Sequence, residues 1–287
     1  MSRRALSLGM RFVIALPYAW LVVFFLLPFA LVLAIALGTN APDSAPPVEL
    51  GLSLANFALL FTDTLYIGAW LASIRIAATA TLVALLLGYP MAYAVARAEP
   101  RRRPLLLMLV ILPFWTSFLI RVYAWMGLLA ENGNLNQFLR WTGLVEDPGT
   151  ILGTEWAILL GMVYAYLPFM VLPLYAALEK LDVGLLEAAA DLGARPFAAF
   201  LTVTLPLSRP GIAAGCLLVF IPAVGEFVIP DLLGGTGALM IGKVLWDEFF
   251  TNSDGPLASA MAIWLLVLLV GPIALFQRQQ ARSLERR

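Results

Sequence analysis

The 287-residue chain contains no histidine and a single cysteine, Cys216. Without histidine it cannot form the Ser-His-Asp or Cys-His arrangements of nucleophilic enzymes. One cysteine allows neither an intrachain disulfide nor a thiolate metal cluster. Charge is also scarce, since 13% of the residues are charged and the formal net charge is zero, which gives no basis for binding nucleic acid. We therefore expect a non-catalytic chain, with neither catalytic residues nor a metal site.

Apolar residues, in contrast, make up 62% of the sequence, which is too many for the surface of a soluble domain. A helix needs about 20 apolar residues to cross a hydrocarbon core ~30 Å thick. The first apolar run is too long for the core of a typical signal peptide, so we interpret it as an uncleaved span. The sequence predicts an all-α membrane protein with six transmembrane helices, at residues 12–37, 65–95, 104–129, 156–178, 210–229 and 256–276.

The basic residues are sorted along the chain. Fourteen of the 18 Lys and Arg residues fall in the N-terminus, the loop 97–103, the loop 180–209 and the tail. Cytoplasmic loops carry such an excess, so both termini are predicted to be cytoplasmic. The segments 39–64, 130–155 and 231–255 then lie outside, the first with a short amphipathic piece near 54–61 and the second with a short helix. Arg75 and Arg121 are expected to pair with acids or to extend toward the interface.

One predicted cytoplasmic stretch, EAAADLGARPFAAFLTVTLPLSRPGIAAG from Glu187 to Gly215, is too polar and too broken to cross a bilayer. Glu187 and Asp191 are four residues apart, so a helix would present both carboxylates on one face. Gly193 is suited to end that helix. Pro196 is suited to begin a second short helix, which Pro206 and Pro210 are expected to stop.

The Glu-Ala-Ala opening, the Gly six residues after the Glu and the Leu-Pro pair ending 13 residues later occur here in one spacing. This spacing resembles the cytoplasmic coupling loop of ABC importer permease subunits. The alternative is a solvated amphipathic hairpin between two membrane spans, with no protein docked on it. The resemblance implies that an ATPase subunit is contacted by Glu187, Ala188, Ala189, Asp191, Gly193 and Ala194.

Three further stretches carry the resemblance: RVYAWMGLL, VYAYLPFMVLPLY and FIPAVGEFVIPDLLGG. They are similar to the polyamine (spermidine/putrescine) branch of these permeases, and most similar to the membrane subunits of the bacterial putrescine importer. The similarity covers about residues 13–279. It implies a type I ABC importer permease fold in the inner membrane and transport by alternating access. It also implies three partners: a second homologous permease subunit, two copies of an ATPase that hold the ATP and magnesium, and a periplasmic polyamine-binding protein. No cofactor is expected in this chain.

We expect residues 1–64 to form a first helix and outer loop, residues 65–276 the permease core with a coupling loop at 179–209, and residues 277–287 a tail. Two alternatives stay open. The chain could be a permease for another organic cation, an amino acid or an opine. The second alternative is a stand-alone secondary transporter. Such a transporter would normally show paired repeats with matching broken helices, and the absence of a second copy of the Pro222 to Pro230 pattern from the sequence disfavours it.

A stretch from Gly237 to Lys243 has the spacing of a phosphate-binding loop. The next residue is Val244, where such a loop needs Ser or Thr for the magnesium ion. The stretch is also expected outside the cell. We therefore expect no ATP hydrolysis in this chain.

Ionisable groups within a span usually face a cavity or a partner. Pro222, Gly225 and Pro230 surround Glu226 and are expected to break the helix there. Glu226 and Asp231 could hold a diammonium ion, with ring faces adding cation–π contacts. Alternatively, the acids mark the end of a helix and the rings form an interfacial belt. Gly211 and Gly215 are expected to allow close helix packing. The candidate translocation path comprises Glu226, Asp231, Trp115, Tyr123, Tyr164 and Tyr166.

Overall fold

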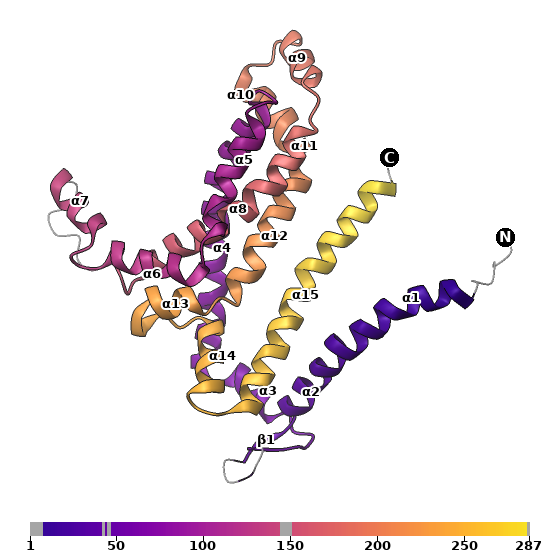
Figure 1. Ribbon diagram of the computed structural model, residues 1–287, viewed down its shortest axis with the longest axis vertical. Coiled ribbons are helices and arrows are strands. Elements are labelled where there is room, and N and C mark those ends of the chain that lie inside the picture. Colours follow the sequence, from indigo (N-terminus) through magenta and orange to yellow (C-terminus); the bar gives the residue numbers. More distant parts are fainter. Residues whose placement is uncertain (1–7, 42–43, 45–46, 144–150, 286–287) are drawn as a thin grey trace. The chain divides into compact units, whose positions relative to one another are not determined.

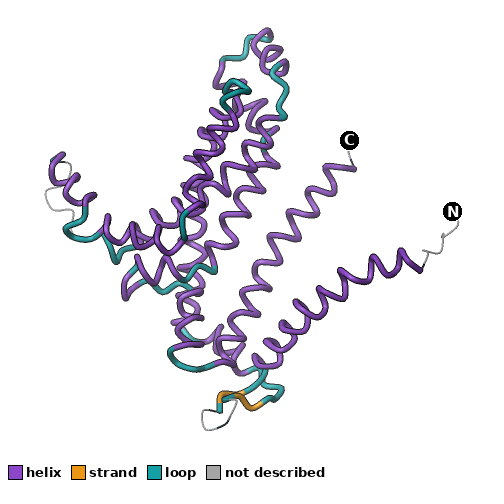
Figure 2. The backbone as a smooth tube through the Cα atoms, in the orientation of Figure 1, coloured by secondary structure: helices purple, strands orange, loops and turns teal. Residues whose placement is uncertain are grey.

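The computed structural model describes the chain except residues 1–7, 42–43, 45–46, 144–150 and 286–287 (Figure 1). The described residues are helical apart from loops and a two-stranded antiparallel hairpin, β1 (Thr39–Asn40) with β2 (Val48–Glu49), in which Thr39 pairs with Glu49 (Figure 2). Within this described part, four helical segments are long and apolar enough to cross a membrane, and two bent helix pairs raise this number to six if each pair is one span. The fold is all-α, as the composition predicts.

The chain divides into two compact units, and the first comprises Met1–Tyr66 with Leu245–Leu268. Its leading helix runs through α1 (Leu8–Leu21), η1 (Val22–Leu26) and α2 (Leu27–Ala36), and its outer segment contains α3 (Ala55–Thr62), close to the predicted amphipathic piece. Asn56 Nδ2 donates to the carbonyl oxygens of Ala36 (3.0 Å) and Gly38 (2.9 Å), so α3 holds the end of α2.

The second unit comprises Ile67–Val244 with Leu269–Arg287, so α4, α14 and α15 each cross the division. Its elements, in chain order, are α4 (Thr64–Arg97), α5 (Arg103–Ile111), η2 (Leu112–Trp115), α6 (Phe118–Leu129), α7 (Asn134–Thr142), α8 (Glu155–Glu179), α9 (Gly184–Asp191), α10 (Pro196–Ala199), η3 (Phe200–Thr204), α11 (Leu205–Leu207), α12 (Arg209–Val224), α13 (Val228–Leu233), η4 (Gly235–Gly237), α14 (Ile241–Phe250) and α15 (Gly255–Glu285). Helix α15 continues through the tail, beyond the expected end near residue 276.

Helix α8 packs closely against its neighbours through glycines. A Cβ atom on Gly211 of α12 would lie 2.6 Å from the Cβ of Ala177, and one on Gly215 would lie 2.7 Å from Sδ of Met170. From α4, a Cβ on Gly88 would lie 2.9 Å from Cγ of Met170. Small residues at these positions let the backbones approach, which confirms the predicted packing role of Gly211 and Gly215.

The third predicted span is not one straight helix. After α5 the chain forms the 3₁₀ turn η2 at Pro113, breaks at Thr116 and continues as α6, and the two helical parts are bent by 86°. Proline lacks the N–H and clashes with the preceding turn, which explains the change of helix type. Arg121 Nη1 donates to the Pro113 carbonyl at 2.6 Å, and its guanidinium lies 5.0 Å from the centre of the Phe114 ring. Arg121 thus holds the break together through a backbone carbonyl and a ring, and neither an acidic partner nor extension to the interface accounts for it. Arg75 does pair with an acid, Glu155, as one of the two alternatives predicted.

Two further expectations about helix ends were wrong. Pro206 does not stop the second short helix. The π-helical turn η3 precedes Pro206 and is wider than an α-helical turn, so the chain stays helical through Pro206 as α11. The bend of 65° comes instead at Ser208, whose hydroxyl donates to the Leu205 carbonyl (3.0 Å) and lies 2.9 Å from the Tyr89 hydroxyl. The fifth predicted span, 210–229, ends as a helix at Val224.

Candidate functional site

The predicted coupling loop forms the helix, glycine turn and second helix expected from its sequence. Asp182 Oδ1 accepts a hydrogen bond from the Gly184 N–H at 2.9 Å and so caps the start of α9. Gly193 has a φ of +82°, a left-handed conformation that a side chain would strain. Its N–H donates to the Ala190 carbonyl at 2.8 Å and closes the helix. The turn therefore fixes the direction in which α10 leaves α9.

Helix α9 keeps its charged face free. Glu187 and Asp191 are exposed, and within the described part of the chain neither has an ion-pair partner. Leu192 directly follows the helix and is 90% exposed. It was not among the contact residues predicted from the sequence. An exposed leucine beside two carboxylates is a surface suited to a protein partner.

The neighbouring face of α9 borders a cavity. This cavity of about 300 Å³ lies between α9, α10 and η3 and is lined by Tyr93, Leu186, Ala190, Ala194 and Pro196, among others. Of the candidates Ala188 and Ala189, Ala188 is exposed and Ala189 is half-buried. Small side chains at this point allow a partner's backbone to come close.

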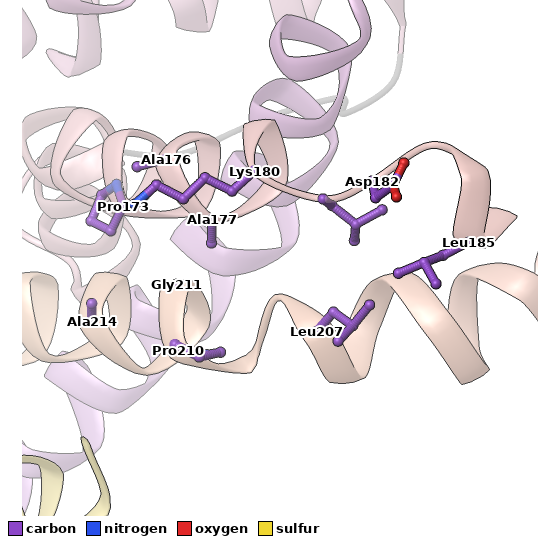
Figure 3. Close-up of a pocket in the computed structure, with 11 residues that line it drawn as sticks. Pro173, Ala176, Ala177, Lys180, Asp182, Leu185, Leu207, Pro210, Gly211 and Ala214 are labelled. Atoms are coloured by element: carbon purple, nitrogen blue, oxygen red, sulfur yellow. The ribbon is translucent and has the colours of Figure 1, made fainter. Parts of the chain in front are cut away.

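A larger cavity of about 570 Å³ lies where α8 turns into α9, against the start of α12 (Figure 3). Lys180 and Asp182 lie on one side of it, and Leu207 and Pro210 on the other (Figure 3). An open groove thus separates the connection between α8 and α9 from the start of α12.

The second group of candidate residues surrounds the interruption between α12 and α13. Glu226 Oε1 accepts hydrogen bonds from the backbone N–H groups of Phe227 (3.2 Å), Val228 (3.0 Å) and Ile229 (3.4 Å). Its other oxygen accepts a hydrogen bond from the Tyr166 hydroxyl of α8. The carboxylate therefore caps the start of α13 and ties it to α8, a role that only the neighbouring Pro and Gly residues indicate in the sequence.

Asp231 lies one turn further along α13 and is exposed. Its Oδ1 is 3.1 Å from Nζ of Lys243, which belongs to the stretch with phosphate-loop spacing. That stretch is the start of α14: the Ile241 N–H donates to Oγ of Ser73 at 2.7 Å, and Gly242 packs against the backbone of Gly225. Lys243 is thus engaged by a carboxylate, and the glycine serves helix packing.

The aromatic candidates do not form one cluster. Tyr166 is buried beside Glu226, whereas Tyr164 faces another side of α8 and meets Trp125 edge-on at 5.4 Å. Trp115 and Tyr123 are 73% and 58% exposed on the bent segment of η2 and α6. The structure therefore brings together Tyr166 and Glu226, and leaves the other rings apart from them.

A comparison with protein families decides what kind of chain carries these features. Residues 84–286 match the family described as "Binding-protein-dependent transport system inner membrane component". The chain belongs to this family. It is a multi-pass permease of the inner membrane, and the predicted class and location are confirmed.

Similar permeases include the spermidine/putrescine transport system permease protein PotB of Haemophilus influenzae, which is 44% identical over 265 residues, 92% of each chain. PotB of Escherichia coli K12 is 44% identical over 87% of this chain and 90% of its own. The molybdenum transport system permease protein ModB of Mycobacterium bovis is 31% identical over 71% of this chain and 75% of its own.

Among solved structures, a chain of the bacterial alginate ABC transporter in complex with an alginate-bound periplasmic protein has a TM-score of 0.71 and 20% identity, covering 95% of this permease and 94% of that chain. A chain of the MetNI methionine ABC transporter has a TM-score of 0.53 with the same identity, covering 77% and 94%. The fold is therefore that of ABC importer permeases.

Proposed function

We propose that this permease is a membrane subunit of an ATP-driven polyamine importer and that it carries putrescine inward. The observation that carries this proposal is the 44% identity to PotB proteins over about nine-tenths of the chain. Identity to ModB is lower and covers less, so a polyamine is favoured over an oxyanion as the cargo. Preference for putrescine over spermidine rests on the sequence resemblance described above.

In this proposal, α9 receives force from a separate ATPase. The contact comprises Glu187, Ala188, Ala189, Asp191, Gly193 and Ala194. Their support is geometric: the carboxylates and Leu192 are exposed, while Leu186 and Ala190 line the cavity between α9, α10 and η3. Two ATPase copies hold ATP and magnesium, one for this subunit and one for a homologous second permease. A periplasmic polyamine-binding protein delivers the cargo.

The proposed topology follows from the sorted basic residues. Both termini and the loop 179–209 lie in the cytoplasm, residues 1–64 form a leading helix and outer loop, residues 65–276 the transport core and residues 277–287 a cytoplasmic tail. Arg103 and Glu179 lie 3.3 Å apart at the predicted cytoplasmic ends of α5 and α8, which fits a shared membrane boundary for these helices.

The proposed path for the cation includes Glu226, Asp231, Trp115, Tyr123, Tyr164 and Tyr166. Glu226 supplies a carboxylate just before α13, and Asp231, which is paired with Lys243, supplies a second one within it. The exposed rings of Trp115 and Tyr123 supply cation–π contacts of about 1–2 kcal/mol each when desolvated. Because Glu226 also caps α13, a cation that binds the carboxylate would compete with the Tyr166 hydroxyl and loosen α13 from α8. Cargo binding and opening of the outer side would then be linked.

The test is uptake by the complete complex in proteoliposomes. This chain is co-purified with its partner permease, ATPase and binding protein, and ATP-dependent uptake of labelled putrescine is measured against competing spermidine and an amino acid. We expect putrescine uptake that putrescine and spermidine inhibit and the amino acid does not. Uptake without the ATPase, or competition by the amino acid alone, would contradict the proposal.

A further inference from the structure

An apolar slot runs between α4 and α8, and neither Tyr166 nor Glu226 lines it. The slot has a volume of about 340 Å³ and is closed at one side by Trp125 of α6. Along α4 it follows residues four apart, Thr79, Val83 and Leu87, which a helix places in one line. The slot therefore runs along the helices.

The lining of this slot offers almost nothing to a polar ligand. Its α8 side consists of side chains such as Leu160 and Val163. The Thr79 hydroxyl donates to the backbone carbonyl of Arg75 at 2.8 Å, so its proton is already used within α4. No carboxylate is among the residues that line the slot, so the slot offers a polyamine no counter-charge. Tyr164 also lines the slot, and a lipid bound there would take Tyr164 out of the proposed cation path. An aliphatic chain is the ligand that fits.

The outer end of the slot is charged. A second cavity of about 260 Å³ shares Thr79, Trp156 and Leu159 with the slot and is also lined by Arg75 and Glu155. These two residues form an ion pair whose side chains remain 61% and 52% exposed. A further ligand can therefore reach both charges at once.

The position of Arg75 along α4 agrees with the membrane boundary. Counting from Arg97, the last residue of α4, a core ~30 Å thick is crossed in about 20 residues, which leads to residue 77. Glu155 is the first residue of α8. Both charges thus lie where lipid headgroups begin, and the apolar slot extends from them toward Leu87, about 18 Å along the helix, close to one leaflet.

We propose that the slot holds one acyl chain of a zwitterionic aminophospholipid of the outer leaflet, whose phosphate contacts Arg75 and whose ammonium contacts Glu155. The two charges of a phosphoethanolamine headgroup complement the two charges of the pair. Glu155 would repel the headgroup of an anionic lipid, which has no ammonium to offer. The bound lipid would fill the space between α4, α6 and α8 and hold α6 against them, whatever the transported solute is.

The complete complex is incorporated into nanodiscs of equal parts phosphatidylethanolamine and phosphatidylglycerol, then extracted, and the retained lipids are quantified by native mass spectrometry. We expect retention of phosphatidylethanolamine by the unmodified complex. Arg75→Gln should lower this retention about tenfold, the effect of losing about one charged hydrogen bond. Glu155→Gln should shift the retained lipid toward phosphatidylglycerol. Arg101→Gln, in an exposed loop, is the matched control and should change neither.

A photo-crosslinking residue in place of Leu87 tests the slot without altering its charges. Leu87 is 50% exposed and lines the slot. We expect a lipid adduct, and its yield should fall when Val83→Trp fills the slot. A protein adduct at Leu87, or lipid retention that Arg75→Gln and Glu155→Gln leave unchanged, would overturn the proposal, because a partner subunit or unspecific lipid would then occupy this face.

Discussion

Replacing Tyr166 by Phe removes a single hydroxyl from the contact between α8 and α13. That hydroxyl donates to a carboxylate, and a hydrogen bond to a charged group contributes about 1.5–3 kcal/mol. The substitution leaves Glu226 Oε2 without this donor, so we expect Tyr166→Phe to lower the free energy of unfolding by about 2 kcal/mol. Tyr123→Phe is the matched control, because Tyr123 is exposed and the structure assigns its hydroxyl no hydrogen bond.

Glu226→Gln separates the cap from the charge. The amide oxygen can still accept from the three N–H groups at the start of α13, whereas the negative charge at the helix N-terminus, worth about 0.3–1 kcal/mol, is lost. The amide nitrogen then stands where Oε2 accepts from Tyr166, so this hydrogen bond is lost too, and the loss of stability should be at least that of Tyr166→Phe. If Glu226 also contacts the cation, Glu226→Gln should lower putrescine uptake more than Tyr166→Phe does.

Thermal unfolding of the purified complex and proteoliposome uptake are measured for both single variants and the double variant. We expect a coupling energy of about 1–2 kcal/mol between Tyr166 and Glu226. Additivity within about 0.5 kcal/mol would refute the argument that the pair holds α13 to α8. If the lower stability of Glu226→Gln accounts for its whole loss of uptake, Glu226 is a cap of α13 and not part of the cation path.

Three further outcomes are expected. Glu187→Lys should abolish ATP-dependent uptake while the chain still inserts and assembles, because it reverses the exposed charge of α9; Glu99→Lys, in another exposed loop, should retain uptake, and normal uptake in the first variant would contradict the coupling role. Gly215→Ala should destabilise the α8–α12 contact by about 1–3 kcal/mol in thermal unfolding, whereas Gly127→Ala, where an added Cβ meets no atom within 4 Å, should not. Thr154→Ala removes the side chain that accepts from the first turn of α8 and should cost about 1 kcal/mol; no change in unfolding would show that this cap is dispensable.

Much of the fold follows from local sequence signals. Hydrophobic length predicted the second and fourth spans to within a few residues of α4 and α8, because each is one uninterrupted helix. Glycine at position 193 predicted the end of the coupling helix, since the left-handed turn depends on that residue alone. The small residues at 211 and 215 predicted close packing of α12 for the same local reason.

The wrong predictions share a physical cause. Each concerns a structural feature that depends on a partner distant in the sequence or on a local change of helix type. The break after Pro113 is satisfied by Arg121, two turns later, and nothing in the composition distinguishes this arginine from one that extends to the interface. Pro206 stays within a helix because η3 widens the preceding turn. The end of α12 was misplaced because Glu226, which continues an apolar run, caps the next helix instead.

The right-angled turn after η2 bears on how the chain enters the membrane during synthesis. Arg103–Trp115 supplies only 13 residues before the turn, about 20 Å of helix, which is short of the ~30 Å core. As it emerges from the ribosome, this segment therefore cannot settle in the bilayer by itself. We expect it to remain at the insertion channel until later helices, among them α8, have been made. A nascent chain arrested before α8 would leave the segment at the surface, where quality-control proteases can reach it.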